Sequence, residues 1–263
     1  MKASIRRTAA WVTLAVMGAL FCLVTLYGKM EGKGQVCQGV RINVTDSVSI
    51  GFVTEDDVMN LLGSQYGSLR DIPLGEIDLA DVETHLDAGR GILKSEVYRT
   101  PDGWLNADIR QRSPIMRIHS GEGAFYCDAQ GYLLPVLPRY VVRLQVVDGE
   151  LPFHLEKDFC GQLADSTARE YLDRLVGMVR YIRSDSRWRE DVSQIHVDRS
   201  GELTLLLRGR PEHFLFGQPD HYAAKFARLE HYFTGVLPLR DSGVSPYKSV
   251  NVQYKGQIVC KNQ

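Results

Sequence analysis

An apolar segment near the start of the chain limits its architecture more than any other feature. Residues Ala9 to Tyr27 form a run of 19 residues without a charged side chain. At about 1.5 Å per residue, a helix of this length covers roughly 28 Å, close to the thickness of a bilayer's hydrocarbon core. The apolar region of a cleavable signal peptide is usually about 7 to 15 residues long and ends at a small-x-small site. We therefore expect residues 9–27 to be a retained transmembrane helix, with a signal peptide as the alternative.

Basic residues on either side of this segment predict its orientation. Three precede it and two follow it: Lys2, Arg6 and Arg7, then Lys29 and Lys33. Because basic side chains favour the cytoplasmic side, residues 1–8 are expected to be a cytoplasmic tail. Residues 28–35 then form a linker, and the bulk of the chain lies across the membrane, as in a single-pass type II protein.

The composition of the chain excludes several classes of protein. Its 263 residues include 31 Lys and Arg against 32 Asp and Glu, which gives a formal net charge of −1. Such a chain is a poor nucleic-acid binder, because that binding depends on neutralising phosphates. The 44% of hydrophobic residues argue against a disordered protein. The mean hydropathy of −0.18 excludes a polytopic membrane protein, and the length allows two domains.

Residues 36–118 are expected to form the first domain, beginning with a strand and two helices. Alternating apolar residues predict the strand over Val36 to Val48. The helices run from Thr54 to Gly63 and from Asp78 to Gly89, each with a capping residue at its start and a glycine at its end.

A hairpin follows in the same domain. The turn Thr100-Pro101-Asp102-Gly103 joins two predicted strands, Ile92 to Arg99 and Trp104 to Arg112, because proline fixes φ and glycine accepts a positive φ. The apolar side chains of the second strand share one face, which we expect to be buried: Leu105, Ala107 and Ile109. The β-α-α-β-β order predicts a small α+β domain, with two helices on one face of a short mixed sheet.

Residues 119–263 are richer in strands and predict a second domain, a mixed β-sheet with flanking helices. Apolar residues at helical spacing predict helices over Asp165 to Ser184 and Pro219 to Phe233. A hairpin is expected to pair Val192 to Asp198 with Glu202 to Arg208. Alternation in Lys248 to Cys260 predicts one strand at the end of the chain, with Gly256 permitting a bend before Ile258 and with three side chains on one face: Val250, Val252 and Tyr254.

Sequence patterns typical of catalysis are absent. The chain has no G-x-S-x-G, H-E-x-x-H, P-loop or G-x-G-x-x-G motif. His213, His221 and His231 are eight and ten residues apart, so no two share a helical turn as metal ligands would. The acidic run Glu55-Asp56-Asp57 suits the first turn of a helix better than a cation site. We expect no catalytic residue, metal, cofactor or small-molecule substrate.

The cysteines leave their pairing open. Cys22 lies in the apolar segment, and the other four have no CxxC spacing: Cys37, Cys127, Cys160 and Cys260. Isolated thiols are one interpretation. In an oxidising compartment, Cys127–Cys160 or Cys37–Cys260 bridges are the alternatives, and the sequence does not favour either.

The predicted terminal strand is the most informative segment for function. A strand with no strand after it often lies at the edge of a sheet and leaves backbone N–H and C=O groups unpaired. A strand from another protein would pair with these groups and use Tyr254, Ile258 or Val259 as side-chain anchors. A strand in the interior of the sheet is the alternative.

Four segments resemble the FtsQ/DivIB family of bacterial cell-division proteins, in the order that the family has. An apolar anchor precedes a β-α-α-β-β unit like the family's POTRA domain, and Val97 to Ile115 (VYRTPDGWLNADIRQRSPI) is similar to its hairpin. Ala124 to Gly131 (AFYCDAQG) resembles the turn that opens its second domain. Phe216-Gly217, Lys225-Phe226-x-x-Leu229 and Val250 to Tyr254 (VNVQY) are similar to its closing helix and strand. The ending resembles that of members from double-membrane bacteria of the Bacteroides type.

The resemblance implies a non-enzymatic divisome scaffold in the inner membrane, with its bulk in the periplasm at the division septum. It implies that FtsB-like and FtsL-like proteins are partners, with FtsB adding a strand along the last strand of the second domain. The matching partner-binding positions are Tyr254, Lys255, Gly256, Gln257, Ile258 and Val259. A POTRA-bearing component of envelope transport or assembly is one alternative function. A membrane-anchored envelope hydrolase is another.

Overall fold

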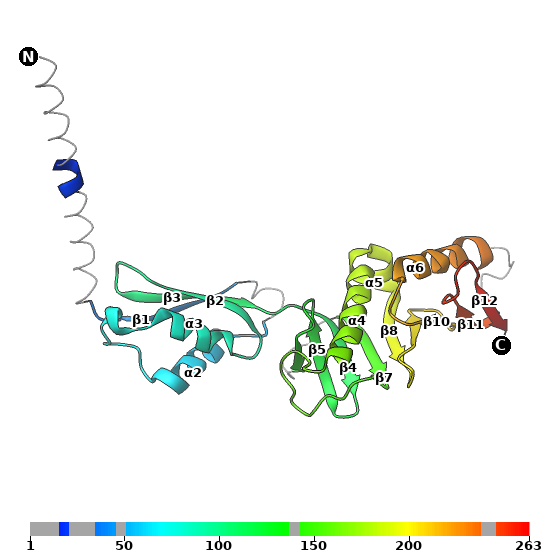
Figure 1. Cartoon of the computed structure of the whole chain (residues 1–263), viewed down its shortest axis with the longest axis horizontal. Helices are drawn as coiled ribbons and strands as arrows, with labels where there is room; N and C mark the ends of the chain where they lie inside the picture. The colour runs from blue at the N-terminus through cyan, green and yellow to red at the C-terminus, as the bar shows by residue number, and fades with distance from the viewer. Residues whose placement is uncertain (1–15, 21–34, 46–50, 137–142, 238–245, 263) are drawn as a thin grey trace, which may run out of the picture. The chain divides into compact units, whose positions relative to one another are not determined.

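The computed structural model describes residues 16–20, 35–45, 51–136, 143–237 and 246–262 (Figure 1). Residues 16–20 are helical, but the rest of the predicted span 9–27, the tail 1–8 and residues 28–34 of the linker lie outside the described residues. Within the described ranges, no helix is both long and apolar enough to cross a membrane. The chain divides into two compact units between Gln111 and Arg112.

The first unit has the expected β-α-α-β-β order. Its elements are β1 (Gly39–Thr45), α2 (Glu55–Tyr66), a short 3-10 helix (Leu74–Glu76), α3 (Leu79–Asp87), β2 (Ile92–Arg99) and β3 (Trp104–Gln111). The three strands form a mixed sheet in the order β1-β3-β2, with β1 parallel and β2 antiparallel to β3. Leu105, Ala107 and Ile109 of β3 are fully buried, which confirms the predicted face.

Local capping interactions explain where the helices of the first unit begin. The Thr54 side chain accepts a hydrogen bond from the Asp57 N–H, and the Asp57 carboxylate accepts one from the Thr54 N–H, a capping box. Asp78 caps α3 in the predicted position. The expected helix ends are wrong. Gly63 lies inside α2, which continues to Gly67 at φ +63°, and α3 ends before Ala88. The positive φ beyond α3 belongs to Gly91 and not to Gly89.

The second unit has one large mixed sheet with helices packed on it (Figure 1). The strand order is β12-β11-β10-β9-β8-β7-β4-β5-β6. The strands are β4 (Pro114–Ser120), β5 (Gly123–Asp128), β6 (Leu133–Pro135), β7 (Gln145–Gly149), β8 (Val192–Val197), β9 (Leu203–Leu207), β10 (His213–Gly217), β11 (Tyr247–Asn251) and β12 (Val259–Asn262). The helices are α4 (Ser166–Ser184), α5 (Ser186–Asp191) and α6 (Tyr222–His231), followed by a π-helical turn (Tyr232–Val236).

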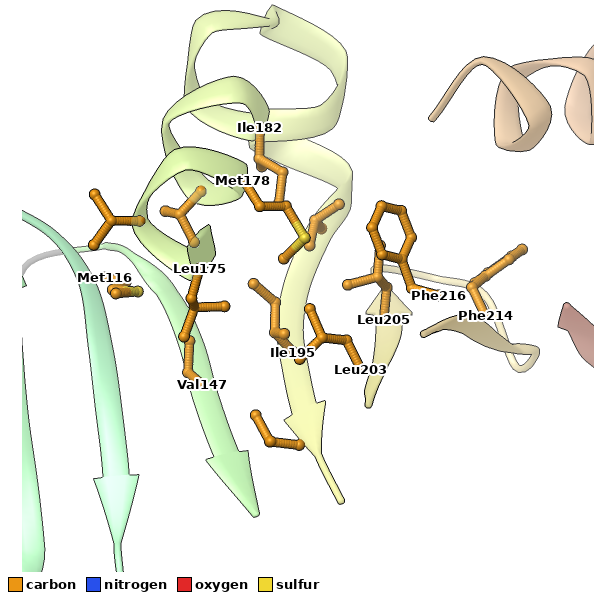
Figure 2. Close-up of a cluster of buried hydrophobic side chains, with 14 of the residues drawn as sticks. Met116, Val147, Leu175, Met178, Ile182, Ile195, Leu203, Leu205, Phe214 and Phe216 are labelled. Atoms are coloured by element: carbon orange, nitrogen blue, oxygen red, sulfur yellow. The ribbon is translucent and has the colours of Figure 1, made fainter. Parts of the chain in front are cut away.

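A row of buried side chains crosses this sheet on its helix-covered face. Successive cross-strand partners, from β4 to β11, are Ile118, Val147, Ile195, Leu205, Phe214 and Val250, and the row ends on β12 at the partly buried Cys260. Figure 2 shows Leu175, Met178 and Ile182 of α4 packed against the β7 and β8 part of this row. The row is the core that fixes strand register, because a one-residue slip would turn these side chains to the other face.

Several boundaries in the second unit differ from the sequence-based expectation. The division at 111/112 precedes the boundary expected after residue 118, because Pro114–Ser120 pairs with β5 and β7. α6 begins at Tyr222 and not at Pro219, since the residue before it, His221, has φ +41°. Lys248 to Cys260 is not a single strand, because the chain reverses between β11 and β12. The four described cysteines form no disulfide with one another, so the two bridges considered are absent from this structure.

Candidate interaction site at an open sheet edge

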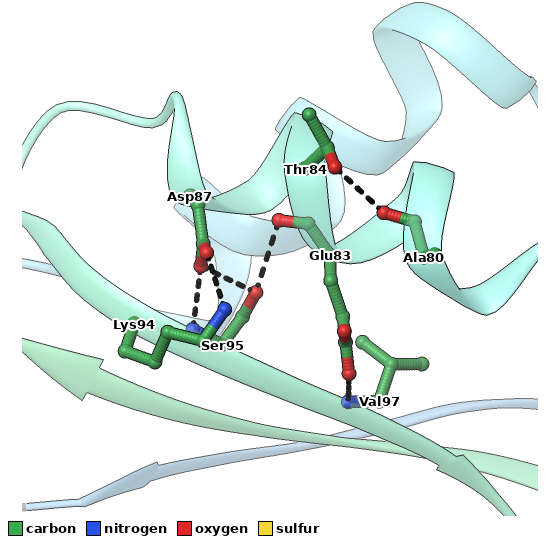
Figure 3. A network of polar contacts seen from close by, with 7 residues as sticks. All are labelled: Ala80, Glu83, Thr84, Asp87, Lys94, Ser95 and Val97. Carbon is green, nitrogen blue, oxygen red and sulfur yellow. Dashed lines mark hydrogen bonds and ion pairs between the residues drawn. The ribbon is translucent and has the colours of Figure 1, made fainter.

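Two of the sheet edges are closed by other parts of the chain. At β2, the Asp87 carboxylate of α3 accepts a hydrogen bond from the Ser95 N–H at 2.6 Å, and Glu83 accepts one from the Val97 N–H at 2.8 Å (Figure 3). At β6, Leu133 exchanges two backbone hydrogen bonds with Gly161, at 2.8 and 2.9 Å. Both edges are therefore protected against pairing with another strand.

The edge at β12 has no such cover among the described residues. β12 ends the nine-stranded order and pairs on one side with β11, where Val250 lies opposite Cys260 and Asn251 opposite Val259. Its other side presents the backbone of a four-residue strand. Cys260 lies at the end of the core row, whereas Val259 belongs to the opposite face of the sheet, in register with Leu215 of β10 through Asn251.

The segment between β11 and β12, residues 252–258, has a firmly held base. The Val252 N–H donates to the Leu215 carbonyl at 3.0 Å, and the Val252 carbonyl accepts a hydrogen bond from Arg228 Nε of α6 at 2.7 Å. The Gln253 N–H donates to the Asn251 side chain at 2.9 Å. Val252 itself is fully buried. This loop therefore leaves the core from a fixed point.

The tip of the loop is exposed and carries most of the predicted site. Tyr254 is 48% exposed and Lys255, Gly256 and Gln257 are exposed, with Gly256 at φ +75° as the bend required. Ile258 packs partly against the core. Of the six predicted residues, only Val259 lies in a strand, and it is also 48% exposed. Tyr254 does not share a strand face with Val250 and Val252, because β11 ends at Asn251.

Tyr254 and Val259 differ from the other large apolar residues around them. Among the described residues of the second unit, they are the two large hydrophobic side chains that are strongly exposed. They lie at either end of residues 254–259, beside the open β12 edge. An exposed aromatic next to the outer strand of a sheet is a combination that protein partners use, because the strand backbone supplies hydrogen bonds and the aromatic supplies buried area.

A pocket of about 620 Å³ lies beneath the loop. Its walls come from the loop (Gln253, Tyr254), the end of β10 (Gly217) and α6 (Lys225, Arg228). Lys225 is nearly buried, and its Nζ donates to the Gln218 carbonyl at 2.7 Å and to Asp220 Oδ1 at 2.6 Å. The cation is therefore already satisfied by groups of this chain.

Electrostatic interactions at this pocket favour the ionised form of Asp220, the ion-pair partner of Lys225. Partial burial disfavours the charged form of Asp220, but the hydrogen bond and positive charge of Lys225 outweigh it and lower the pKa of Asp220. Adjacent His221 has a left-handed backbone at φ +41°, a conformation in which histidine is enriched among the non-glycine residues. The described residues contain no group of three His, Cys, Asp or Glu side chains that could hold a metal ion.

The sequence did not reveal the residues that support this site. Arg228 holds the loop, and Lys225 and Gly217 line the pocket beneath it, but the periodicity of α6 marked only its apolar positions. Gly217 and Lys225 both stand in segments similar to the FtsQ/DivIB family. The available signal for Lys225 was a lysine at a helical position that is expected to be buried. Lys261 and Asn262 complete β12 beyond the expected end at Cys260.

Comparison with known families covers nearly the whole folded part. A family model described as FtsQ/DivIB, C-terminal related, matches residues 113–261, which is more than half of the chain. A POTRA-like domain model matches residues 35–110. The two matches meet where the structure divides into its two units. No individually curated protein matches the chain.

Proposed function

Because the chain belongs to the FtsQ/DivIB family of bacterial cell-division proteins, we propose that it is a non-enzymatic scaffold of the division machinery. In this proposal, residues 9–27 anchor it in the inner membrane at the division septum, and residues 28–263 lie in the periplasm. It holds FtsB-like and FtsL-like partners and links early and late division proteins. The observation that carries the proposal is the open β12 edge, with Tyr254 and Val259 exposed beside it.

Strand addition would explain how this edge binds a partner. A strand placed against β12 satisfies the N–H and C=O groups on its free side. Such bonds form with any extended segment, so selectivity depends on neighbouring side chains. Val259 and Lys261 lie on the sheet face opposite Cys260, because side chains alternate along a strand. A partner with apolar and acidic side chains in alternate positions fits that face.

Tyr254 is the proposed anchor. It is half exposed in the chain alone, so a partner that covers it removes additional apolar surface from water. A desolvated aromatic at an interface contributes about 2 kcal/mol or more, and its loss then raises the Kd about 30-fold. Lys255, Gly256 and Gln257 flank the anchor, and Ile258 fixes the return of the chain into β12.

The POTRA-like unit is proposed to serve a separate role, in localisation and contact with upstream division proteins. Its β2 edge is covered by Glu83 and Asp87, so that edge is unsuited to strand addition. This contrast favours β12 over β2 as the strand where FtsB-like and FtsL-like partners bind.

The proposal is tested with the full chain in detergent and the periplasmic parts of the FtsB-like and FtsL-like proteins of the same organism. Tyr254→Ala is expected to weaken binding about 30-fold. Tyr98→Ala is the matched control, because Tyr98 is similarly exposed, at 43%, but lies on β2 of the other unit. A chain truncated after Ile258 lacks β12 and is expected to lose binding.

The outcomes separate the family role from the site. If the intact chain binds neither partner, the scaffold proposal is wrong. If it binds and Tyr254→Ala and Tyr98→Ala have equal affinities, the scaffold proposal survives and Tyr254 is not the anchor. Hydrogen exchange of β9 in each variant shows that a loss of affinity is not caused by unfolding.

A further inference from the structure

A second polar pocket lies at the other end of the large sheet. Its volume is about 290 Å³, and four arginines and one glutamate contribute its charged lining: Arg143, Arg183, Arg189, Arg208 and Glu190. These residues come from four places in the chain, just before β7, the last turn of α4, α5, and just after β9. The fold therefore brings together cations that are far apart in sequence.

The arginines in this pocket are under-neutralised. Arg189 has one acidic neighbour, Glu190, at 3.8 Å between Nε and Oε1. Within the described part of the chain, Arg143, Arg183 and Arg208 form no ion pair with a carboxylate. Four positive groups thus face one negative group.

A buried side chain orients part of the cluster. Gln145 is 4% exposed, and its Nε2 donates to the Arg189 carbonyl at 3.0 Å. Its Oε1 accepts a hydrogen bond from Arg183 Nη1 at 3.4 Å. Gln145 therefore links α4 and α5 and limits where the Arg183 guanidinium can point.

Arg183 is the least exposed of the four arginines. Burial, and then the positive charge of Arg189, lower the pKa of Arg183. The negative end of the α4 dipole accounts for an arginine at position 183, in the last turn of that helix. It does not account for Arg143 or Arg208, which come from segments next to β7 and β9.

We propose that this pocket binds a phosphate-type oxyanion, carried by a small soluble phosphate or by a lipid headgroup. Guanidinium groups bind phosphate oxygens through paired hydrogen bonds, and several of them suit a group with more than one negative charge. A carboxylate carries a single charge and would leave most of the excess uncompensated. The pocket holds one or two phosphate groups and is too small for a helix.

This site is separate from the one proposed for protein partners. The arginine pocket lies where β7 and β8 begin and β9 ends, whereas the 252–258 loop follows the end of β11, next to the end of β10. Because β7, β8, β10 and β11 run in the same direction and β9 in the opposite one, the two sites lie at opposite ends of the sheet. Anion binding can therefore fail while partner binding holds.

Isothermal titration calorimetry on the full chain in detergent tests the proposal, with inorganic pyrophosphate as the probe at constant ionic strength. We expect saturable 1:1 binding that Arg183→Gln and Arg208→Gln each weaken about tenfold, the effect of losing one charged hydrogen bond. Arg174→Gln removes the same charge from an exposed position of α4 outside the pocket and should leave the affinity unchanged. Arg208 is exposed, so its replacement keeps the test valid if Arg183→Gln fails to fold.

Dihexanoyl phosphatidic acid, titrated as a soluble monomer, distinguishes the two sources of the anion. Tighter binding of this lipid than of pyrophosphate, lost in Arg208→Gln, identifies a headgroup, and the reverse order identifies a soluble phosphate. The proposal is overturned if neither probe binds, or if Arg208→Gln and Arg174→Gln bind both probes as the unmodified chain does.

Discussion

Replacement of Gly217 tests how the base of the 252–258 loop is held. Gly217 ends β10 with φ +74°, and a Cβ added there would lie 3.0 Å from Gln253 Cβ. Because a Cβ position is fixed by the backbone, the first residues of the loop would have to shift. Gly209 is the matched control, since it has a similar φ of +69° but an added Cβ would meet nothing within 4 Å.

The two substitutions are expected to differ in magnitude. Gly209→Ala should lower the free energy of unfolding by about 1–2 kcal/mol, the strain of a left-handed alanine. Gly217→Ala adds an overpacking term of about 1–3 kcal/mol. The total expected for Gly217→Ala is then roughly 2–5 kcal/mol.

Native-state hydrogen exchange of β9 and β11 amides measures both effects in the same unit. The double variant Gly217→Ala with Gln253→Gly removes the atom that the new Cβ would meet, and it should recover much of the extra loss in a double-mutant cycle. Equal destabilisation by Gly217→Ala and Gly209→Ala, with no coupling to Gln253, would refute the contact as the constraint on this loop.

Two further predictions concern the stability of each unit. Burial opposes ionisation of Asp87, but hydrogen bonds from Lys94 and Ser95 outweigh this effect and lower the pKa of Asp87. The contribution of Asp87 to the free energy of unfolding is therefore complete above the unfolded pKa of about 3.9 and is lost as pH falls through the folded pKa. Asp87→Asn should therefore destabilise the first unit at pH 7 and make its free energy of unfolding depend less on pH between about pH 5 and pH 2, as measured by urea denaturation at each pH. An unchanged dependence on pH would contradict this. Ile195→Ala, in the fully buried centre of β8, should lower the free energy of unfolding of the second unit by about 2–5 kcal/mol, whereas Thr204→Ala on the opposite face should cost less than about 1 kcal/mol; similar losses would show that the row does not form the core.

Interactions between neighbouring residues made much of the fold predictable. Thr54 and Asp57 cap α2, and Asp165 caps α4, because a cap needs only a side chain and an N–H two or three residues away. The turn before Trp104 and the alternation of β3 are equally local. The order of elements in the first unit followed from such signals.

Only tertiary structure decided where the edges of the sheets lie. Alternation in Lys248 to Cys260 indicated one strand with a bend at Gly256, yet it could not show that the chain reverses there and that β12, with four residues, forms the outer strand. The position of a strand depends on partners distant in sequence, here Leu215 for Val252 and Arg228 for the loop. The arginine pocket has the same origin, since its four arginines come from separate elements. Sequence determines local conformation through nearby atoms, whereas open edges and clustered charges arise only when distant segments pack together.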